Sequence, residues 1–202
     1  MKRQIFLQEN ILRKILKKKI LIILFTLILT ENISANQKWI IDKNISNITF
    51  EVPVLFTTNV KGEFKDIQGF VEIDLENYIN NKAVLSVKIE SLDVNYKKYR
   101  DLILSNIFFD SNNFPFAVLD TKKFSYKDEE ELKLNIELTI KGLSKILETK
   151  IKIKKYTNDL VQILGDLELS RNEFNIGIGN WSNTTILKDT IKIKSNIFLI
   201  RE

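Results

Sequence analysis

Apolar and polar residues alternate one by one along much of this chain, and the clearest stretch runs from Leu132 to Ile140. Every second residue there is leucine or isoleucine, and the residues between them are lysine, asparagine, glutamate and threonine. Gly142 interrupts the alternation, which resumes over 147–154. Because successive side chains of a strand point to opposite faces, this alternation predicts β-strands with one solvated and one buried face.

The same alternation recurs in shorter segments, which are 48–52, 60–65, 71–75, 85–90, 167–169 and 191–194. With the two longer stretches they make roughly eight strands joined by short turns, which is typical of an antiparallel all-β domain. Tyr96, Tyr99 and Ile103 follow helical spacing, so we expect one short helix over 96–105. Strands of this number can close into a barrel whose interior is either packed or hollow enough for one small apolar ligand. The residues alone leave both interiors open.

The N-terminal region has the features of an export signal. Four lysines between positions 14 and 19 precede an uncharged apolar run over 20–29, and small residues ending in Ala35 follow. The run is shorter than the roughly 20 apolar residues that a membrane-spanning helix needs. We therefore expect residues 1–35 to be a cleaved signal peptide, with an uncleaved membrane anchor as the alternative, and 36–202 to be a single domain.

The positive charge of the chain lies in this leader. The first 35 residues hold seven basic and two acidic residues, which accounts for the whole net charge of +5. The 24 basic and 24 acidic residues that follow cancel, so the charge gives no argument for a nucleic-acid partner.

Cysteine and histidine are both absent. Their absence excludes disulfides, Ser-His and Cys-His nucleophilic catalysis, and histidine-based metal sites. Only carboxylates remain for metal binding or acid-base chemistry, and no motif identifies such a site. We therefore expect no catalytic residues, no metal site and no cofactor.

The central stretch 100–115 interrupts the strand pattern with an Arg-Asp pair, a short apolar run and a cluster of aromatic residues. One interpretation is a helical plug over one end of the β structure, and the other is the mouth and wall of an apolar pocket. Arg100 and Arg171 stand out in a lysine-rich chain. Each either ties a loop or helix to strand-end carbonyls or contacts the polar head of a ligand at the barrel mouth.

Ordered motifs along the chain resemble the YceI-like proteins, a family of lipid- or polyisoprenoid-binding proteins. The opening of that family is matched by Trp39-Ile40-Ile41-Asp42, Ser46, Phe50, Val60-Lys61-Gly62-Glu63-Phe64 and Gly69. Its central motif is matched by Arg100-Asp101, Leu104, Phe108-Phe109-Asp110 and Phe114-Pro115. A turn between strands is matched by 138–145, and the ending by Ser170-Arg171, Phe174, 176–179, Trp181 and 188–191.

The resemblance implies a single extended, lipocalin-like antiparallel barrel of eight strands with a short helical insertion. It also implies export to the periplasm and an apolar tunnel for a long isoprenoid, an isoprenoid quinone or a similar long-chain lipid. The membrane would then serve only as the source or acceptor of lipid, and a homodimer is one assembly we consider. Family members commonly carry histidines near the positions of Ile45, Val54 and Ile103, where this chain has apolar residues, so the head-group preference of relatives does not transfer.

Twelve residues are expected to contact the ligand, ten as wall and two as rim or head-group contacts. The expected wall residues are Phe50, Phe64, Tyr99, Ile103, Phe108, Phe109, Phe116, Leu134, Ile136 and Phe174, and the expected rim residues are Arg100 and Arg171.

Three functions remain open at this point. The first is a non-enzymatic carrier or sequestering protein for an isoprenoid. The second is a packed barrel that acts through protein partners in an envelope stress response, and the third is an enzyme that uses carboxylates alone. An interior tunnel would favour the first, a large exposed apolar patch without a tunnel the second, and two buried carboxylates facing each other in a cleft the third.

Overall fold

The computed structural model describes residues 37–55, 58–74, 78–126 and 131–201. The predicted signal peptide, residues 1–35, lies outside the described residues. Within the described ranges the chain forms an antiparallel β structure with one short α-helix and four 3₁₀ turns. The helices of this part are too short and insufficiently apolar to cross a membrane.

The described residues contain eleven β-strands, and every pairing between them is antiparallel. The strands are β1 (Gln37–Ile41), β2 (Asn47–Val52), β3 (Val60–Phe64), β4 (Ile67–Ile73), β5 (Lys82–Lys88), β6 (Leu92–Val94), β7 (Phe116–Asp120), β8 (Glu131–Ile140), β9 (Leu143–Lys155), β10 (Leu160–Ser170) and β11 (Thr190–Arg201). The helical elements are α2 (Arg100–Leu104) and the 3₁₀ turns η1 (Ile89–Ser91), η2 (Lys97–Tyr99), η3 (Asn172–Phe174) and η4 (Gly179–Ser182).

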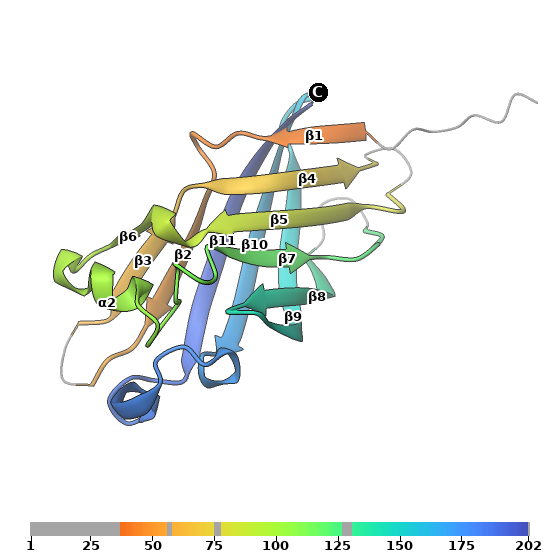
Figure 1. Cartoon of the computed structure of the whole chain (residues 1–202). Helices are drawn as coiled ribbons and strands as arrows, with labels where there is room; N and C mark the ends of the chain where they lie inside the picture. Colours follow the sequence, from red (N-terminus) through yellow and green to blue (C-terminus); the bar gives the residue numbers. More distant parts are fainter. Residues whose placement is uncertain (1–36, 56–57, 75–77, 127–130, 202) are drawn as a thin grey trace, which may run out of the picture. The chain divides into compact units, whose positions relative to one another are not determined.

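Eight of these strands close into a barrel in the order β1-β4-β5-β7-β8-β9-β10-β11, because β11 pairs with β1. Figure 1 shows β1, β4, β5 and β7 stacked side by side across the steeper β9, β10 and β11. The predicted antiparallel barrel of eight strands with a short helical insertion is therefore confirmed.

Three of the barrel strands are bent, and each is completed by a second segment. One end of β11 pairs with β1, and the other pairs with β2 from Lys192↔Glu51 to Asn196↔Asn47. β2 then pairs with β3, and β3 with β6, while β1 pairs with β4 and β4 with β5. The pairs β1–β2, β3–β4 and β5–β6 are thus halves of bent strands that extend the barrel at one end.

The bends explain where the sequence prediction differs from the fold. The segments expected as separate strands at 60–65 and 71–75 are β3 and β4, the two halves of one bent strand. β1, β6 and β7 were not among the predicted strands, because they are short and their alternation is weak. The expected helix over 96–105 consists of η2 followed by α2.

The segment 100–115 covers the free edge of β6. Arg100 donates from Nε to the Leu92 carbonyl oxygen at 3.0 Å and from Nη2 to the Glu90 carbonyl oxygen at 2.7 Å, which ties α2 to this edge. Ile103 is buried and belongs to the same core cluster as Leu92. Figure 1 shows α2 beside β3 and β6. The segment therefore acts as a plug over this side of the barrel.

A two-residue turn joins β8 to β9, because Ile140 pairs with Leu143. Lys141 and Gly142 both have positive φ angles, 49° and 72°, which is the conformation of the hairpin turns that match the twist of a sheet. A Cβ on Gly142 would lie 3.0 Å from the Phe114 ring, so this position needs glycine for packing as well as for conformation.

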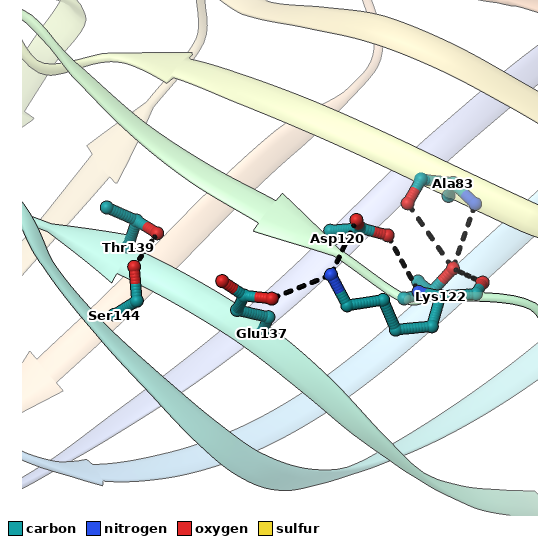
Figure 2. Close-up of polar contacts among 7 residues, drawn as sticks. Ala83, Asp120, Lys122, Glu137, Thr139 and Ser144 are labelled. Atoms are coloured by element: carbon teal, nitrogen blue, oxygen red, sulfur yellow. Dashed lines mark hydrogen bonds and ion pairs between the residues drawn. The ribbon is translucent and has the colours of Figure 1, made fainter.

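The seam between β7 and β8 is short, with its register running from Val118↔Thr139 to Asp120↔Glu137. Figure 2 shows an ion cluster at this seam, in which Lys122 Nζ lies 3.0 Å from Asp120 Oδ2 and 2.6 Å from Glu137 Oε2. Lys122 also donates its backbone N–H to Asp120 Oδ1 at 2.7 Å. The cluster thus joins the end of β7 to β8.

The barrel is solid at one end. The first core cluster contains Trp39, Ile67, Ile73, Val161 and Leu199, all 3% exposed or less. Two further clusters line the rest of the interior, one around β8, β10 and β11 and one around β3, β6 and the plug. The candidate site lies between these last two clusters.

Candidate ligand-binding cavity

An apolar cavity of about 320 Å³ occupies the interior away from the solid end. This volume falls in the range of ligand pockets, about 300–1,000 Å³. The buried residues of the first core cluster do not line it, but Ile48 and Leu85, which pack against that cluster, do. The cavity therefore ends on the solid core.

One wall is built from aromatic side chains of the bent strands and the plug. The rings of Phe50 on β2 and Phe64 on β3 lie 5.7 Å apart, and Phe109 of the plug meets Phe64 edge to face at 5.9 Å. Ile103 on α2 and Phe108 complete this side. Because aromatic rings favour such edge-to-face contacts, these side chains form an ordered wall that joins the plug to the strands.

The opposite wall consists of inward-facing aliphatic residues of β8, β10 and β11. These residues are Ile136, Leu138, Ile140, Leu167, Leu169, Ile191 and Ile193. Ala117 and Leu119 of β7 join them. The two walls together would surround an alkyl or isoprenoid chain with carbon atoms.

Small residues at inward positions keep the interior open. Gly165 on β10 pairs with Ser195 on β11, and both line the cavity. Gly62 lies beneath the Phe50 ring, so a Cβ at this position would collide with that ring and force it to move. Protein interiors are normally close-packed, and bulkier side chains at these positions would fill the space that the small residues leave open.

The mouth of the cavity lies near η2 and the loop between β2 and β3. Tyr96, Lys98, Tyr99 and Thr58 line it, and Tyr96 packs edge to face on Tyr99 with ring centroids 5.9 Å apart. The Lys98 Nζ lies 5.0 Å from the centroid of the Tyr99 ring. Polar groups thus gather at the mouth, whereas the two walls are apolar.

Arg171 also lines the cavity, and the residue is 1% exposed. Its guanidinium donates to four backbone carbonyl oxygens at 2.8–3.2 Å, those of Ile176, Gly177, Leu187 and Lys188. Burial lowers the pKa of this guanidinium, and the charge of Asp189 opposes the shift. Arg171 therefore holds both ends of the 176–188 loop around one buried cation.

Lys141 connects the plug to the same loop region. Its Nζ donates to the carbonyl oxygens of Asn106 at 3.0 Å and Asn175 at 2.9 Å. Burial lowers the pKa of Lys141, and the charge of Asp110 opposes the shift. The turn between β8 and β9 is thereby tied to both segments that close this end of the cavity.

Eight of the twelve residues expected at the ligand site line this cavity. They come from strands, plug and loop far apart in the chain, and they are Phe50, Phe64, Tyr99, Ile103, Phe108, Phe109, Ile136 and Arg171. The barrel therefore brings the aromatic residues of the central stretch together with residues near both ends of the domain.

Four of the twelve lie elsewhere. Arg100 contacts backbone carbonyls away from the cavity, and Phe116 points outward from β7 with 44% of its surface exposed. Leu134 packs against the second core cluster without lining the cavity, and Phe174 is fully buried in that cluster. Because side chains alternate along β7, Ala117 and Leu119 face inward and Phe116 does not.

Several lining residues were missed by sequence reasoning. The alternation around Phe116 would have identified Ala117 and Leu119 had the segment been taken as a strand. Gly165 carried a signal as well, since a glycine inside a strand often marks a place where another group approaches closely. Lys98 carried no sequence signal, because only the folded mouth brings it to the cavity.

The model of the YceI-like domain matches residues 39–199 of this chain. Curated relatives include a UPF0312 protein of Photorhabdus laumondii, 28% identical over 113 residues that cover 56% of this chain and 58% of the relative. A UPF0312 protein of Enterobacter sp. strain 638 is 27% identical over 141 residues, covering 68% of this chain and 73% of the relative. The match thus spans little more than half the length of the first of these relatives.

Solved structures share the fold at low sequence identity. BcnA of Burkholderia cenocepacia superposes with a TM-score of 0.72 at 22% identity, over 78% of this chain and 98% of that protein. A polyisoprenoid binding domain from Saccharophagus degradans gives 0.64 at 10% identity, over 83% and 100% of the two chains. The YCEI protein of Campylobacter jejuni gives 0.62 at 24% identity, over 74% and 89%. At these identities the likeness shows the fold alone.

Proposed function

This chain belongs to the YceI-like domain family, and from that premise we propose that its barrel binds the tail of a polyisoprenoid or similar long-chain lipid. The observation that carries the proposal is the cavity of about 320 Å³ between two apolar walls. Moving apolar surface from water into such a site is favourable by about 25 cal/mol per Å². A long tail therefore needs few polar contacts to remain bound.

An isoprenoid as the ligand is supported by the structurally similar protein from Saccharophagus degradans, which is a polyisoprenoid binding domain. The walls of this chain suit the same chemistry, because branched aliphatic residues and phenylalanine rings contact a methyl-branched chain well. Val54 and Ile103, at two positions where the family resemblance places histidines, line the cavity as apolar residues. They extend the surface available to the tail.

The proposed role is that of a carrier or storage protein without catalytic activity, exported to the periplasm. Within the described residues, neither Asp nor Glu lines the cavity, so the interior offers no carboxylate for acid-base chemistry. The cavity also favours lipid binding over a packed barrel that acts through protein partners. The export step rests on the basic and apolar pattern of residues 1–35.

The test is native mass spectrometry of the protein purified from its own envelope, followed by organic extraction of whatever it holds. We expect one isoprenoid or similar lipid per protein chain. A protein that comes out empty and also fails to take up added isoprenoids would overturn the proposal.

Two phenylalanine variants make the test specific to the cavity. Phe109→Glu places a charge in the wall, and we expect it to reduce the extracted lipid at least about tenfold because a carboxylate is costly to bury beside hydrocarbon. Phe116→Glu is the matched control on the outer face of β7 and should keep the lipid. Should Phe109→Glu fold poorly, Ala117→Leu enlarges an apolar side chain that lines the cavity without adding charge and should lower lipid content in the same direction.

A further inference from the structure

The charged residues of the cavity all carry the same sign. Among the described lining residues only Lys98 and Arg171 are charged, and no acidic side chain accompanies them. The outer face of the barrel differs, because its lysines pair with carboxylates, as Lys192 does with Glu168 at 3.7 Å. The described lining of the cavity therefore carries a net positive charge, although residues 36–202 as a whole are neutral.

Arg171 contributes to this potential from a fixed position. In the described part of the chain no carboxylate lies within 4.0 Å of its guanidinium, and its donors are directed at backbone carbonyl oxygens and at Asn172 Oδ1. Those acceptors are neutral, and Asp189 is the acidic residue whose charge acts on the guanidinium, outside ion-pair distance. The residue is therefore a source of field and not a free ligand contact.

Lys98 differs from Arg171, because its ammonium group lies at the mouth and can contact a ligand. The side chain lies over the Tyr99 ring, with Nζ 5.0 Å from the ring centroid, and forms no ion pair with any described residue. The adjacent Lys97 does form one, with Asp93. The phenol groups of Tyr96 and Tyr99 line the mouth beside Lys98 and can donate hydrogen bonds.

We propose that the ligand carries an anionic head group, a phosphate or carboxylate, which contacts Lys98 at the mouth while its tail fills the cavity. This inference rests on the proposed lipid-binding function and adds the class of head group to it. An ammonium beside an aromatic ring can bind an anion by a charge-assisted hydrogen bond, and the field of Arg171 favours the same sign of charge. A cationic head would meet repulsion from both residues.

The experiment compares three probes with the same tail, which are farnesyl phosphate, farnesol and farnesylamine. They are titrated into the full chain after detergent exchange has removed the bound lipid. We expect the phosphate to bind about tenfold more tightly than the alcohol, and the amine more weakly than the alcohol. Raising salt from about 50 to about 300 mM should narrow the difference, because the contact is at a solvated mouth.

Two neighbouring lysines provide the variant and its control. Lys98→Gln should lower the affinity for farnesyl phosphate to about that for farnesol, because the ammonium group is lost and the apolar walls are kept. Lys97→Gln should keep the preference, because Lys97 does not line the cavity. Loss of the preference in both variants, or in neither, would overturn the assignment to Lys98.

The remaining outcomes distinguish a failure of the head-group proposal from a failure of the lipid-binding proposal. Equal affinity for all three probes would overturn the head-group assignment while the tail-binding function stands. Failure of every probe to bind would instead contradict the lipid-binding function itself. Inorganic phosphate at millimolar concentration should not compete with farnesyl phosphate, and strong competition would mean that the site takes a free anion and not an amphiphile.

Discussion

At the scale of single residues, Arg171 decides how one end of the cavity is closed. Its guanidinium joins backbone carbonyls from both ends of the 176–188 loop, and the side chain packs where a Cβ on Gly177 would come within 2.9 Å of Nη1. A planar group with five donors can serve several carbonyls at once, which a single ammonium cannot. The loop conformation therefore depends on arginine and not merely on positive charge.

We expect Arg171→Lys to lower the free energy of unfolding by at least about 3 kcal/mol, because several buried carbonyls lose their donors. Urea denaturation of the lipid-free protein would measure the change. Arg201→Lys is the control, since Arg201 lies on the surface 3.9 Å from Asp159 and should cost less than about 0.5 kcal/mol. Equal denaturation midpoints for the two variants would contradict this role of Arg171.

At the scale of elements, the seam between β7 and β8 is short, as is the seam between β1 and β11 that closes the barrel. The ion cluster of Asp120, Lys122 and Glu137 lies at this seam (Figure 2). Partial burial raises the pKa of Asp120, but the backbone N–H and the ammonium group of Lys122 outweigh it, so the pKa is lowered overall. The carboxylate is therefore stabilised in its charged form by the folded seam.

Because the pKa of Asp120 is lower in the folded state, its contribution to stability is present above the unfolded pKa and is lost as pH falls through the folded value. We expect Asp120→Asn to lower the urea midpoint modestly at pH 7, and this difference should disappear as acid protonates the folded carboxylate, at a pH below the ordinary aspartate pKa. A Glu168→Gln variant, which breaks an exposed pair with Lys192, is the comparison at each pH. A difference that persists unchanged into acid would show that the charge of Asp120 is not what supports the seam.

At the scale of the whole domain, the barrel is solid at one end and hollow at the other. The two tryptophans of the chain report on these ends separately. Trp39 is buried in the first core cluster and donates from Nε1 to the Ile73 carbonyl oxygen at 3.3 Å. Trp181 lines the cavity, with its ring 5.7 Å from that of Phe108.

Ligand binding should therefore change the fluorescence of one tryptophan and not the other. In a Trp39→Phe variant, which keeps Trp181, we expect farnesol to shift the emission to shorter wavelength as water leaves the cavity. In a Trp181→Phe variant, which keeps Trp39, the emission should stay constant. A response of similar size in both variants would mean that the ligand reorganises the entire barrel, contrary to a preformed cavity.

The strand-rich character of this protein could be predicted from the alternation of apolar and polar residues. This alternation is a local property that needs no knowledge of the partner strand. It also placed the helix near 96–105 and identified Phe64, Ile103 and Phe109 as residues of the interior. The ordered motifs went further and identified the family across 39–199.

Only the tertiary structure decided which apolar residues line the cavity and which fill the core. Leu134 and Ile136 are two residues apart and lie on the same face of β8, yet of these two only Ile136 lines the cavity. The difference depends on what lies opposite each residue once the barrel closes. Whether an inward side chain meets another side chain or an open space is set by contacts between distant strands, which no local pattern contains.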